Sequence, residues 1–190
     1  MTTWHWVRHG PTHQTSFTGW RDVGADLSDA DAVARLAAHL PSDALVVSSD
    51  LTRSVDTANA LQGARTRLPH DPALREFHFG VWDGVHFSTV AEWHPDLSRA
   101  YWERPGDVAP PGGESWNTSA ARVAMAVRRI EAAYPDQDII AVAHFGVILT
   151  QVQAVLSLSA YDVLAHKIDP LSVTTLNRAS GIATVINHRP

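Results

Sequence analysis

The alternation of two residue patterns constrains the fold of this chain most. Short segments rich in β-branched and apolar residues alternate with stretches in which apolar residues recur at helical spacing. The predicted strands cover residues 3–7, 44–48, 139–143, 172–176 and 182–187. Residues 44–48 and 139–143 are continuous apolar runs, which is typical of strands that are covered on both faces. We therefore expect an α/β fold, a three-layer α/β/α sandwich with a mostly parallel central sheet.

Helix start and stop signals lie between these strands. Ser28 and Asp31 form a capping-box-like pattern before the first apolar stripe, and Asp50 is a good N-cap for the second helix, which Gly63 ends. The predicted helices cover residues 28–40, 50–62, 115–134 and 147–156. The chain shows no internal repeat or long linker, so we expect a single domain over residues 1–190.

The segment from Leu68 to Gly113 does not follow the alternation. It is rich in proline, glycine and tryptophan and has no long periodic stretch. We expect an irregular insertion that covers one edge of the sheet and the active site, because long loops within a compact domain are usually functional or mobile. The tryptophans at 82, 93, 102 and 116 either line the mouth of a pocket or form a small core under this loop.

Composition excludes several classes of function. The chain has 15 Lys and Arg against 20 Asp and Glu, a net charge of −5, so it has no global positive field to bind nucleic acid. The absence of cysteine excludes a thiolate metal site and a cysteine nucleophile. No secretory signal pattern opens the sequence, and no apolar run approaches about 18 residues. We expect a cytoplasmic protein that has no nucleic-acid or membrane partner.

Three predicted strands end in residues that suit phosphate chemistry. Arg8 and His9 end the first strand, Arg53 follows the second on the first turn of a helix, and His144 follows the third. Ligands of open α/β sheets bind beyond the carboxyl ends of the strands, so these side chains are expected to converge. Guanidinium groups match phosphate oxygens, and a helix N-terminus adds backbone N–H donors. The sequence thus predicts a site for a phosphoryl group.

The motifs around these residues also resemble a known family. The segments are Arg8-His9-Gly10-Pro11-Thr12, residues 17–28, residues 48–58, residues 74–84, residues 111–115 with Arg122-Val123, and residues 142–147. In this order they resemble the histidine phosphatase superfamily, which is phosphoglycerate mutase-like, over most of the chain. The resemblance implies an enzyme of that superfamily, a phosphatase that needs no metal or other cofactor.

The resemblance also implies roles for individual residues. His9 would be the nucleophile that becomes phosphorylated, and Glu76 the acid that protonates the leaving group. The positive cradle for the phosphoryl group would consist of Arg8, Arg53 and His144. Thr15, Thr18 and Gly19 fall in the region of the substrate loop. Thr15 stands where relatives often have asparagine, and its hydroxyl can still donate one hydrogen bond.

Glu76 needs a raised pKa for its role, because a free glutamate is ionised at neutral pH. Burial beside Phe77, Phe79 and Trp82, together with the charge of the substrate phosphate, would raise this pKa. The same carboxylate could then accept a proton from the attacking water.

Three functions remain open at this stage. The first is hydrolysis of a small phosphorylated metabolite, the second is phosphoglycerate mutation, and the third is phosphate binding without turnover. Hydrolysis is favoured because Phe77 follows the acid where family mutases have an arginine, and because residues 85–113 offer only Arg99 and Arg104 for a second anionic group. The substrate, the oligomeric state and the role of His78 are not determined by the sequence.

Overall fold

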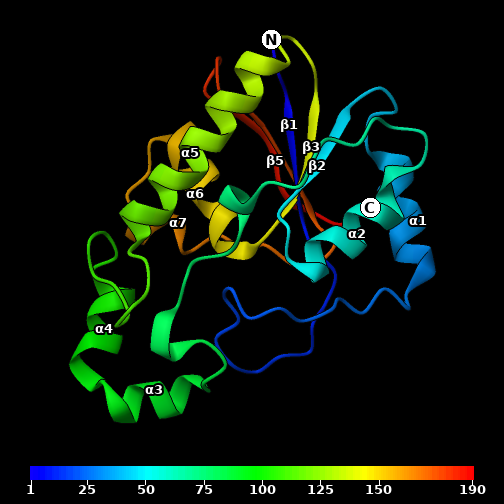
Figure 1. Ribbon diagram of the computed structural model, residues 1–190. Coiled ribbons are helices and arrows are strands. Elements are labelled where there is room, and N and C mark those ends of the chain that lie inside the picture. The colour runs from blue at the N-terminus through cyan, green and yellow to red at the C-terminus, as the bar shows by residue number, and fades with distance from the viewer.

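A five-stranded sheet with helices on both faces forms the centre of the molecule in a computed structural model, which describes residues 1–190 (Figure 1). The strand order is β2-β3-β1-β4-β5. The strands are β1 (Trp4–Arg8), β2 (Leu45–Ser48), β3 (Ile139–Ala143), β4 (Val173–Asn177) and β5 (Ile182–His188). All five lie within a residue or two of the predicted segments, so the α/β class is confirmed.

The sheet is mixed in its pairing. β3 pairs in parallel with both β1 and β2, whereas β4 is antiparallel to both β1 and β5. Four strands therefore run in one direction and β4 alone runs against them. The short link between β4 and β5 forms a hairpin, which only antiparallel strands permit. Because β1, β2 and β3 run in parallel, their carboxyl ends meet at one edge of the molecule.

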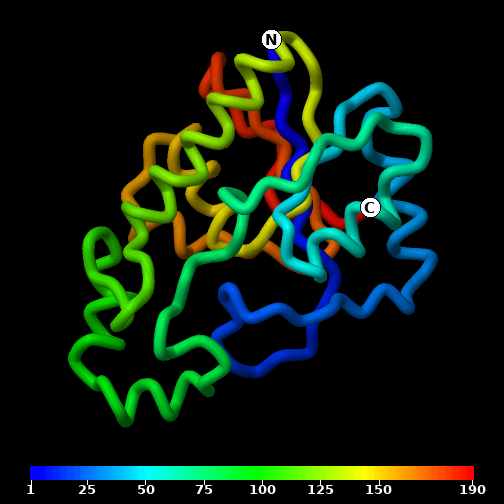
Figure 2. Tube along the Cα trace, in the orientation of Figure 1, coloured from blue at the N-terminus to red at the C-terminus, as the bar shows by residue number.

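Helices cover the two faces of the sheet as separate layers (Figures 1 and 2). One layer contains α1 (Ala30–His39) and α2 (Thr52–Gln62), and the other contains α5 (Trp116–Ala133), α6 (Phe145–Leu156) and α7 (Ala160–Val163). Along β3, Ile139, Ala141 and Ala143 face the α5–α6 core, and Ile140 and Val142 face the α1–α2 core. This alternation is the two-residue period of a strand that is buried on both faces.

The insertion is more regular than predicted. It contains two 3-10 turns, η1 (Pro72–Leu74) and η2 (Gly80–Trp82), and two helices, α3 (Phe87–Trp93) and α4 (Pro95–Glu103). Its side chains Trp82, Val90 and Tyr101 form a separate small core together with Phe17, which lies between β1 and α1. In Figure 2 the green part of the insertion, with α3 and α4, lies below the sheet, at the end where β1 and β3 finish. The sequence does not predict α3 and α4, because each helix is short and packs mainly on this local core.

Two predicted helix caps are wrong by a residue. Asp29, rather than Ser28, caps α1 through a bond from the Ala32 N–H. The N-cap of α2 is Leu51, because the Asp50 carboxylate is instead engaged by the Arg75 guanidinium at 2.7 and 2.5 Å. A bidentate ion pair of this kind provides two charge-assisted hydrogen bonds between fully charged groups.

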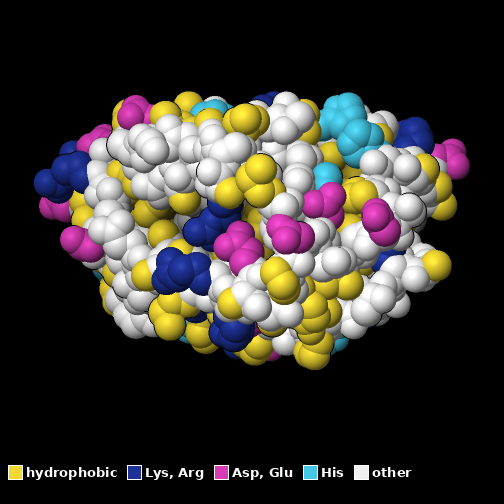
Figure 3. All heavy atoms as spheres, turned by 90° about the horizontal axis from the view of Figure 1, so that it is seen from above, with side chains coloured by type: hydrophobic (Ala, Val, Ile, Leu, Met, Phe, Trp, Pro, Cys, Tyr) yellow, Lys and Arg dark blue, Asp and Glu magenta, His cyan; other side chains and the backbone are white.

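None of the helices combines the length and the apolar character that crossing a lipid bilayer requires. On the face shown in Figure 3, acidic and basic side chains are interspersed and form no continuous basic area. The absence of a nucleic-acid partner stays a prediction.

Candidate active site

His9 follows β1 and is almost completely buried, with 6% of its surface exposed. Its backbone N–H donates to the carbonyl of Ala143 on β3, which ties it to the central strand. The His9 Nδ1 atom lies 2.7 Å from the Gly10 carbonyl oxygen. A carbonyl can only accept, so Nδ1 carries the proton and Nε2 keeps its lone pair. Burial and the charges of Arg53 and Arg8 lower the pKa of His9 to about 3. The imidazole is therefore neutral and its Nε2 is free to act as a nucleophile.

Arg53 lies on the first turn of α2 and is held by three acceptors. Its Nη2 donates to the Gly19 carbonyl at 2.7 Å, its Nη1 to the Arg21 carbonyl at 3.0 Å, and its Nε to Nδ1 of His144 at 3.2 Å. Only 1% of the Arg53 surface is exposed. Arg53 thus presents a fixed positive charge at the carboxyl end of the sheet.

His144 caps the N-terminus of α6 and is fully buried. Its ring lies 5.1 Å from the His9 ring, centroid to centroid, and its Nε2 is 2.8 Å from the Ser49 hydroxyl. Burial first, and then the charge of Arg53, hold the pKa of His144 well below its usual value. His144 is close to His9 as expected, but in the free protein its neutral form is favoured. The full positive charges at the site are therefore those of the arginines.

Arg8 supplies the second of these charges. Its Nη1 donates to the Ile168 carbonyl at 2.6 Å, and its guanidinium carbon lies 5.6 Å from the centre of the Phe145 ring. The buried Arg8 Nε has no partner within the protein. An unpaired N–H on a buried guanidinium is a ready donor to an anionic oxygen.

Glu76 lies beside these cations with 7% of its surface exposed. Its Oε1 accepts from the Phe77 N–H at 3.0 Å and its Oε2 from the Gly146 N–H at 3.1 Å. Burial raises the pKa of Glu76, while the two N–H donors and the nearby arginines act in the opposite direction. The predicted increase in the pKa of Glu76 is therefore confirmed. A Cβ on Gly146 would lie 2.7 Å from Oε1, so only glycine lets α6 begin this close to the carboxylate.

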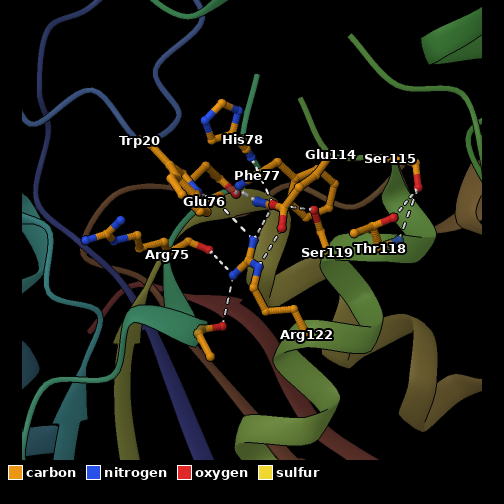
Figure 4. A network of polar contacts seen from close by, with 12 residues as sticks. Trp20, Arg75, Glu76, Phe77, His78, Glu114, Ser115, Thr118, Ser119 and Arg122 are labelled. Carbon is orange, nitrogen blue, oxygen red and sulfur yellow. Dashed lines mark hydrogen bonds and ion pairs between the residues drawn. The ribbon is translucent and has the colours of Figure 1, made fainter. Parts of the chain in front are cut away.

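A polar network behind Glu76 holds its backbone (Figure 4). The Glu76 carbonyl accepts from Trp20 Nε1 at 2.8 Å and from Arg122 Nη2 at 3.2 Å. Arg122 Nη1 also donates to the carbonyls of residues 73 and 75, both at 2.9 Å.

The Arg122 guanidinium forms a bidentate pair with Glu114, at 2.8 and 2.6 Å. Glu114 in turn accepts from the His78 N–H at 3.1 Å. The Glu76 segment is therefore tied to the start of α5.

From the sequence, Glu114 and Arg122 are expected only as part of a family motif at the start of a helix. Their positioning role was missed because the three carbonyls that Arg122 binds lie more than 40 residues away in the chain. The His78 ring packs edge-on against Trp20, with 4.5 Å between ring centroids. Its contacts hold the loop beside Glu76.

The three residues of the predicted substrate loop differ in their placement. The Gly19 carbonyl is an acceptor for Arg53, and a Cβ on Gly19 would lie 2.5 Å from the Phe77 carbonyl oxygen. Thr18 donates only to the Ser16 carbonyl, and Thr15 is exposed with no side-chain hydrogen bond. The structure thus joins Gly19 to Arg53. The two threonine side chains bond to none of the predicted catalytic residues, which are Arg8, His9, Arg53, Glu76 and His144. Their contact with substrate stays a prediction.

Comparison with known proteins adds to this geometry. The family model of the histidine phosphatase superfamily (branch 1) matches residues 5–188. A glucosyl-3-phosphoglycerate phosphatase of Mycolicibacterium vanbaalenii is 36% identical over 168 residues, which are 80% of this chain and 73% of that protein. A bifunctional protein of Mycobacterium tuberculosis is 36% identical over 127 residues. That match covers 66% of this chain and 33% of the relative, so the chain spans about a third of that protein.

Solved structures share the whole fold. YhfR of Bacillus stearothermophilus superimposes with a TM-score of 0.87 at 25% identity, over 97% of this chain and 95% of the other. The mycobacterial glucosyl-3-phosphoglycerate phosphatase in complex with inorganic phosphate gives a TM-score of 0.82 at 28% identity, over 98% and 97% of the two chains. The sheet and the layers described above are thus those of these structures.

Proposed function

This chain belongs to the histidine phosphatase superfamily, branch 1, and we propose that it is a phosphomonoesterase that hydrolyses a small phosphorylated metabolite through a phosphohistidine at His9. One observation carries the proposal. The His9 Nδ1–H is engaged by the Gly10 carbonyl, which leaves the Nε2 lone pair of a neutral imidazole near the guanidinium groups of the buried Arg53 and the half-buried Arg8. This is the arrangement that nucleophilic attack on a phosphate ester requires.

In the first step, His9 Nε2 attacks phosphorus and the bond from phosphorus to the ester oxygen breaks. The negative charge on the equatorial oxygens is stabilised by Arg8 and Arg53, which are fixed before the substrate arrives. Glu76 in its protonated form gives its proton to the departing alkoxide, so the alcohol leaves neutral. The raised pKa of Glu76 favours this protonated form.

In the second step, the Glu76 carboxylate accepts a proton from a water molecule as the water oxygen attacks phosphorus. The nitrogen–phosphorus bond breaks, its electron pair returns to His9 Nε2, and inorganic phosphate leaves. Both steps are completed by the chain's own residues, and no metal takes part in them. His144 keeps the Arg53 guanidinium oriented through its Nδ1 acceptor.

Phosphoglycerate mutation is the second candidate. A 2,3-bisphosphoglycerate-dependent phosphoglycerate mutase of Afipia carboxidovorans is 32% identical over 127 residues, 61% of each chain. A mutase must hold a second anionic group near Glu76. Phe77 is buried with its ring against Trp116, and Arg99 and Arg104 are exposed on the insertion. These placements favour hydrolysis.

The test is hydrolysis of p-nitrophenyl phosphate near pH 6 by wild type and by His9→Ala, each with and without EDTA. We expect turnover that EDTA does not reduce and that His9→Ala abolishes. The matched control is His13→Ala, because His13 is exposed and pairs with Asp26 outside the site. Rapid quenching should trap a phosphohistidine, stable in base and labile in acid, in wild type alone. Loss of turnover with EDTA, or full turnover by His9→Ala, would overturn the mechanism. Phosphate binding without turnover would indicate the non-catalytic alternative.

A further inference from the structure

The loop that holds Arg53 is itself held by the insertion. The Phe17 N–H donates to the Val85 carbonyl at 3.0 Å, and the Gly84 N–H donates to the Phe17 carbonyl at 2.8 Å. An isolated antiparallel bridge joins the same two segments one residue further on. The chain between β1 and α1 therefore runs beside the insertion (Figure 2). We call residues 19–22 of this chain the Arg53 loop.

One carboxylate of the insertion binds the Arg53 loop at two points. Asp83 directly follows η2, and its Oδ1 accepts from the Gly19 N–H at 2.9 Å. Its Oδ2 accepts from the Arg21 N–H at 2.8 Å. Both oxygens of the side chain thus bind the loop backbone, in hydrogen bonds that the negative charge strengthens. An amide in this position would have only one acceptor oxygen for the two N–H groups.

The two residues that Asp83 binds are the two that hold the Arg53 guanidinium. The Gly19 carbonyl accepts from Arg53 Nη2 at 2.7 Å, and the Arg21 carbonyl accepts from Nη1 at 3.0 Å. Each of these loop residues is therefore bound by its N–H to the carboxylate and by its carbonyl to the guanidinium. A shift of the loop would move both carbonyl acceptors of Arg53 together.

The end of the Arg53 loop is fixed on α2. The Asp22 carboxylate accepts from the Thr52 N–H at 2.8 Å and from the Thr52 hydroxyl at 2.7 Å, one residue before Arg53. Burial lowers the pKa of this arginine, and the negative charges of Glu76, Asp22 and Asp83 act in the opposite direction. The loop thus connects α2 to the insertion, and Asp83 is the side chain that anchors its backbone there.

We propose that Asp83 is a positioning residue for the phosphoryl site, which fixes the Gly19 and Arg21 carbonyls and through them the direction of the Arg53 guanidinium. The inference rests on the proposed phosphatase function, because a phosphoryl group is what Arg53 would stabilise. Asp83 itself touches no reacting group. Its effect is to keep a charged donor in place before the substrate arrives, so that no rearrangement is needed during the reaction.

The first test replaces the carboxylate. For Asp83→Ala we expect kcat/KM on p-nitrophenyl phosphate to fall by about tenfold or more, as a donor misplaced by about 1 Å can cause. Asp83→Asn keeps one acceptor, so its rate should lie between those of Asp83→Ala and wild type. Asp29→Ala is the matched control, because Asp29 also accepts from a backbone N–H, at the N-terminus of α1. Equal rates for Asp83→Ala and Asp29→Ala would overturn the proposal.

A double-mutant cycle shows whether Asp83 acts through Arg53 or only stabilises the fold. Asp83→Ala, Arg53→Ala and the double variant are compared with wild type, at a temperature where urea unfolding shows all four to be folded. Once Arg53 is absent, we expect Asp83→Ala to lower kcat/KM by less than about twofold, because the carbonyls then have no guanidinium to direct. A loss as large as in the presence of Arg53 would overturn the positioning role.

Phosphate binding separates this inference from the catalytic proposal. The probe is inorganic phosphate, and calorimetry measures its affinity for wild type, Asp83→Ala and Asp29→Ala. We expect Asp83→Ala alone to bind phosphate more weakly, by about threefold or more. This weaker binding, in a protein that hydrolyses no ester, would support the role of Asp83 and refute the phosphatase function. Turnover through His9, with rate and phosphate affinity unchanged by Asp83→Ala, would refute the role of Asp83 and leave the phosphatase function standing.

Discussion

The Nε–H of Arg53 donates a hydrogen bond to Nδ1 of His144 across 3.2 Å. A guanidinium can only donate, so Nδ1 of His144 is the unprotonated acceptor and its proton lies on Nε2, toward the Ser49 hydroxyl. This contact orients the imidazole and the guanidinium together. With the Gly19 and Arg21 carbonyls as further acceptors, Arg53 needs no rearrangement before it can stabilise the charge on a phosphoryl group.

Replacing Arg53 should therefore reduce the rate strongly. For Arg53→Ala we expect kcat on p-nitrophenyl phosphate to fall by about 10²–10³, the usual cost of removing one fixed donor from a site of developing charge. Arg53→Lys should recover little of this, because an ammonium group cannot span the three acceptors. Arg35→Ala is the control, since Arg35 is exposed on α1 and binds the Pro190 carbonyl. A lysine variant with the wild-type rate would contradict this account.

A methyl group at Gly19 should displace the carbonyl that accepts a hydrogen bond from the Arg53 guanidinium. The added Cβ would meet the Phe77 carbonyl oxygen at 2.5 Å, so the Gly19 loop must shift and take the acceptor of Arg53 with it. We expect Gly19→Ala to lower kcat/KM by about tenfold or more, as a misplacement of about 1 Å can. Gly24→Ala is matched to it, because a Cβ there has no atom within 4 Å. Similar rates for the two variants would show that the loop does not position Arg53.

Glu76→Gln should separate proton transfer from binding. An alkyl leaving group needs the proton of Glu76, whereas p-nitrophenolate leaves without one. We expect the variant to slow hydrolysis of an alkyl phosphate by about 10²–10⁴ and hydrolysis of p-nitrophenyl phosphate far less. The measurement is kcat for both esters with wild type and variant. Equal slowing of the two would count against Glu76 as the acid.

The ion pair behind Glu76 should matter for stability as well as for rate. Arg122→Ala removes the ion-pair partner of the Glu114 carboxylate and one donor from each of three carbonyls, so we expect it to lower the free energy of unfolding by about 3 kcal/mol. Arg129→Ala, also on α5, removes an exposed pair with Asp71 and should cost less than about 1 kcal/mol. Urea unfolding measures both.

Measurements of activity distinguish a positioning role of Arg122 from a purely stabilising one. Because Arg122 acts on the Glu76 backbone, Arg122→Ala should also slow alkyl phosphates more than p-nitrophenyl phosphate at a temperature where it remains folded. An equal effect on the two esters would leave Arg122 with a structural role only.

The buried imidazole of His9 should make the protein less stable in mild acid. Its pKa is about 3 in the folded state and about 6.5 when the chain is unfolded, so between these values the unfolded chain alone binds the proton. Stability is thus fully present above about pH 6.5 and is lost as the pH falls, by up to about 1.4 kcal/mol per pH unit for this group.

His9→Gln removes that contribution. The free energy of unfolding of this variant should therefore fall less steeply than that of wild type between about pH 7 and about pH 5. Urea unfolding across this range measures the difference in slope. Parallel curves would show that His9 takes up its proton in the folded state.

The strands, the longer helices and the placement of Arg8, His9, Arg53 and His144 at the carboxyl ends of the strands could be predicted from the sequence. Glu76 is assigned only through the family resemblance. Apolar runs such as residues 139–143 specify a buried strand through contacts between near neighbours, and His9, Arg53 and His144 stand directly after such runs or one turn beyond. The helices of the insertion could not be predicted, because they are stabilised by a small core that includes Phe17, from a distant part of the chain.

Local signals in the sequence are enough to place residues at the carboxyl ends of the strands, because strand periodicity and helix start signals act between near neighbours. The tautomer of His9, the pairing of Asp50 with Arg75 in place of a helix cap, and the hydrogen bond from Arg122 to the Glu76 carbonyl follow only from the folded structure. The folded structure also brings together the separate segments that line the apolar pocket beside Glu76. Most of these features depend on contacts between groups that are far apart in the chain. Hydrogen bonds, burial and charge act between groups that are close in space, and only folding brings these groups together.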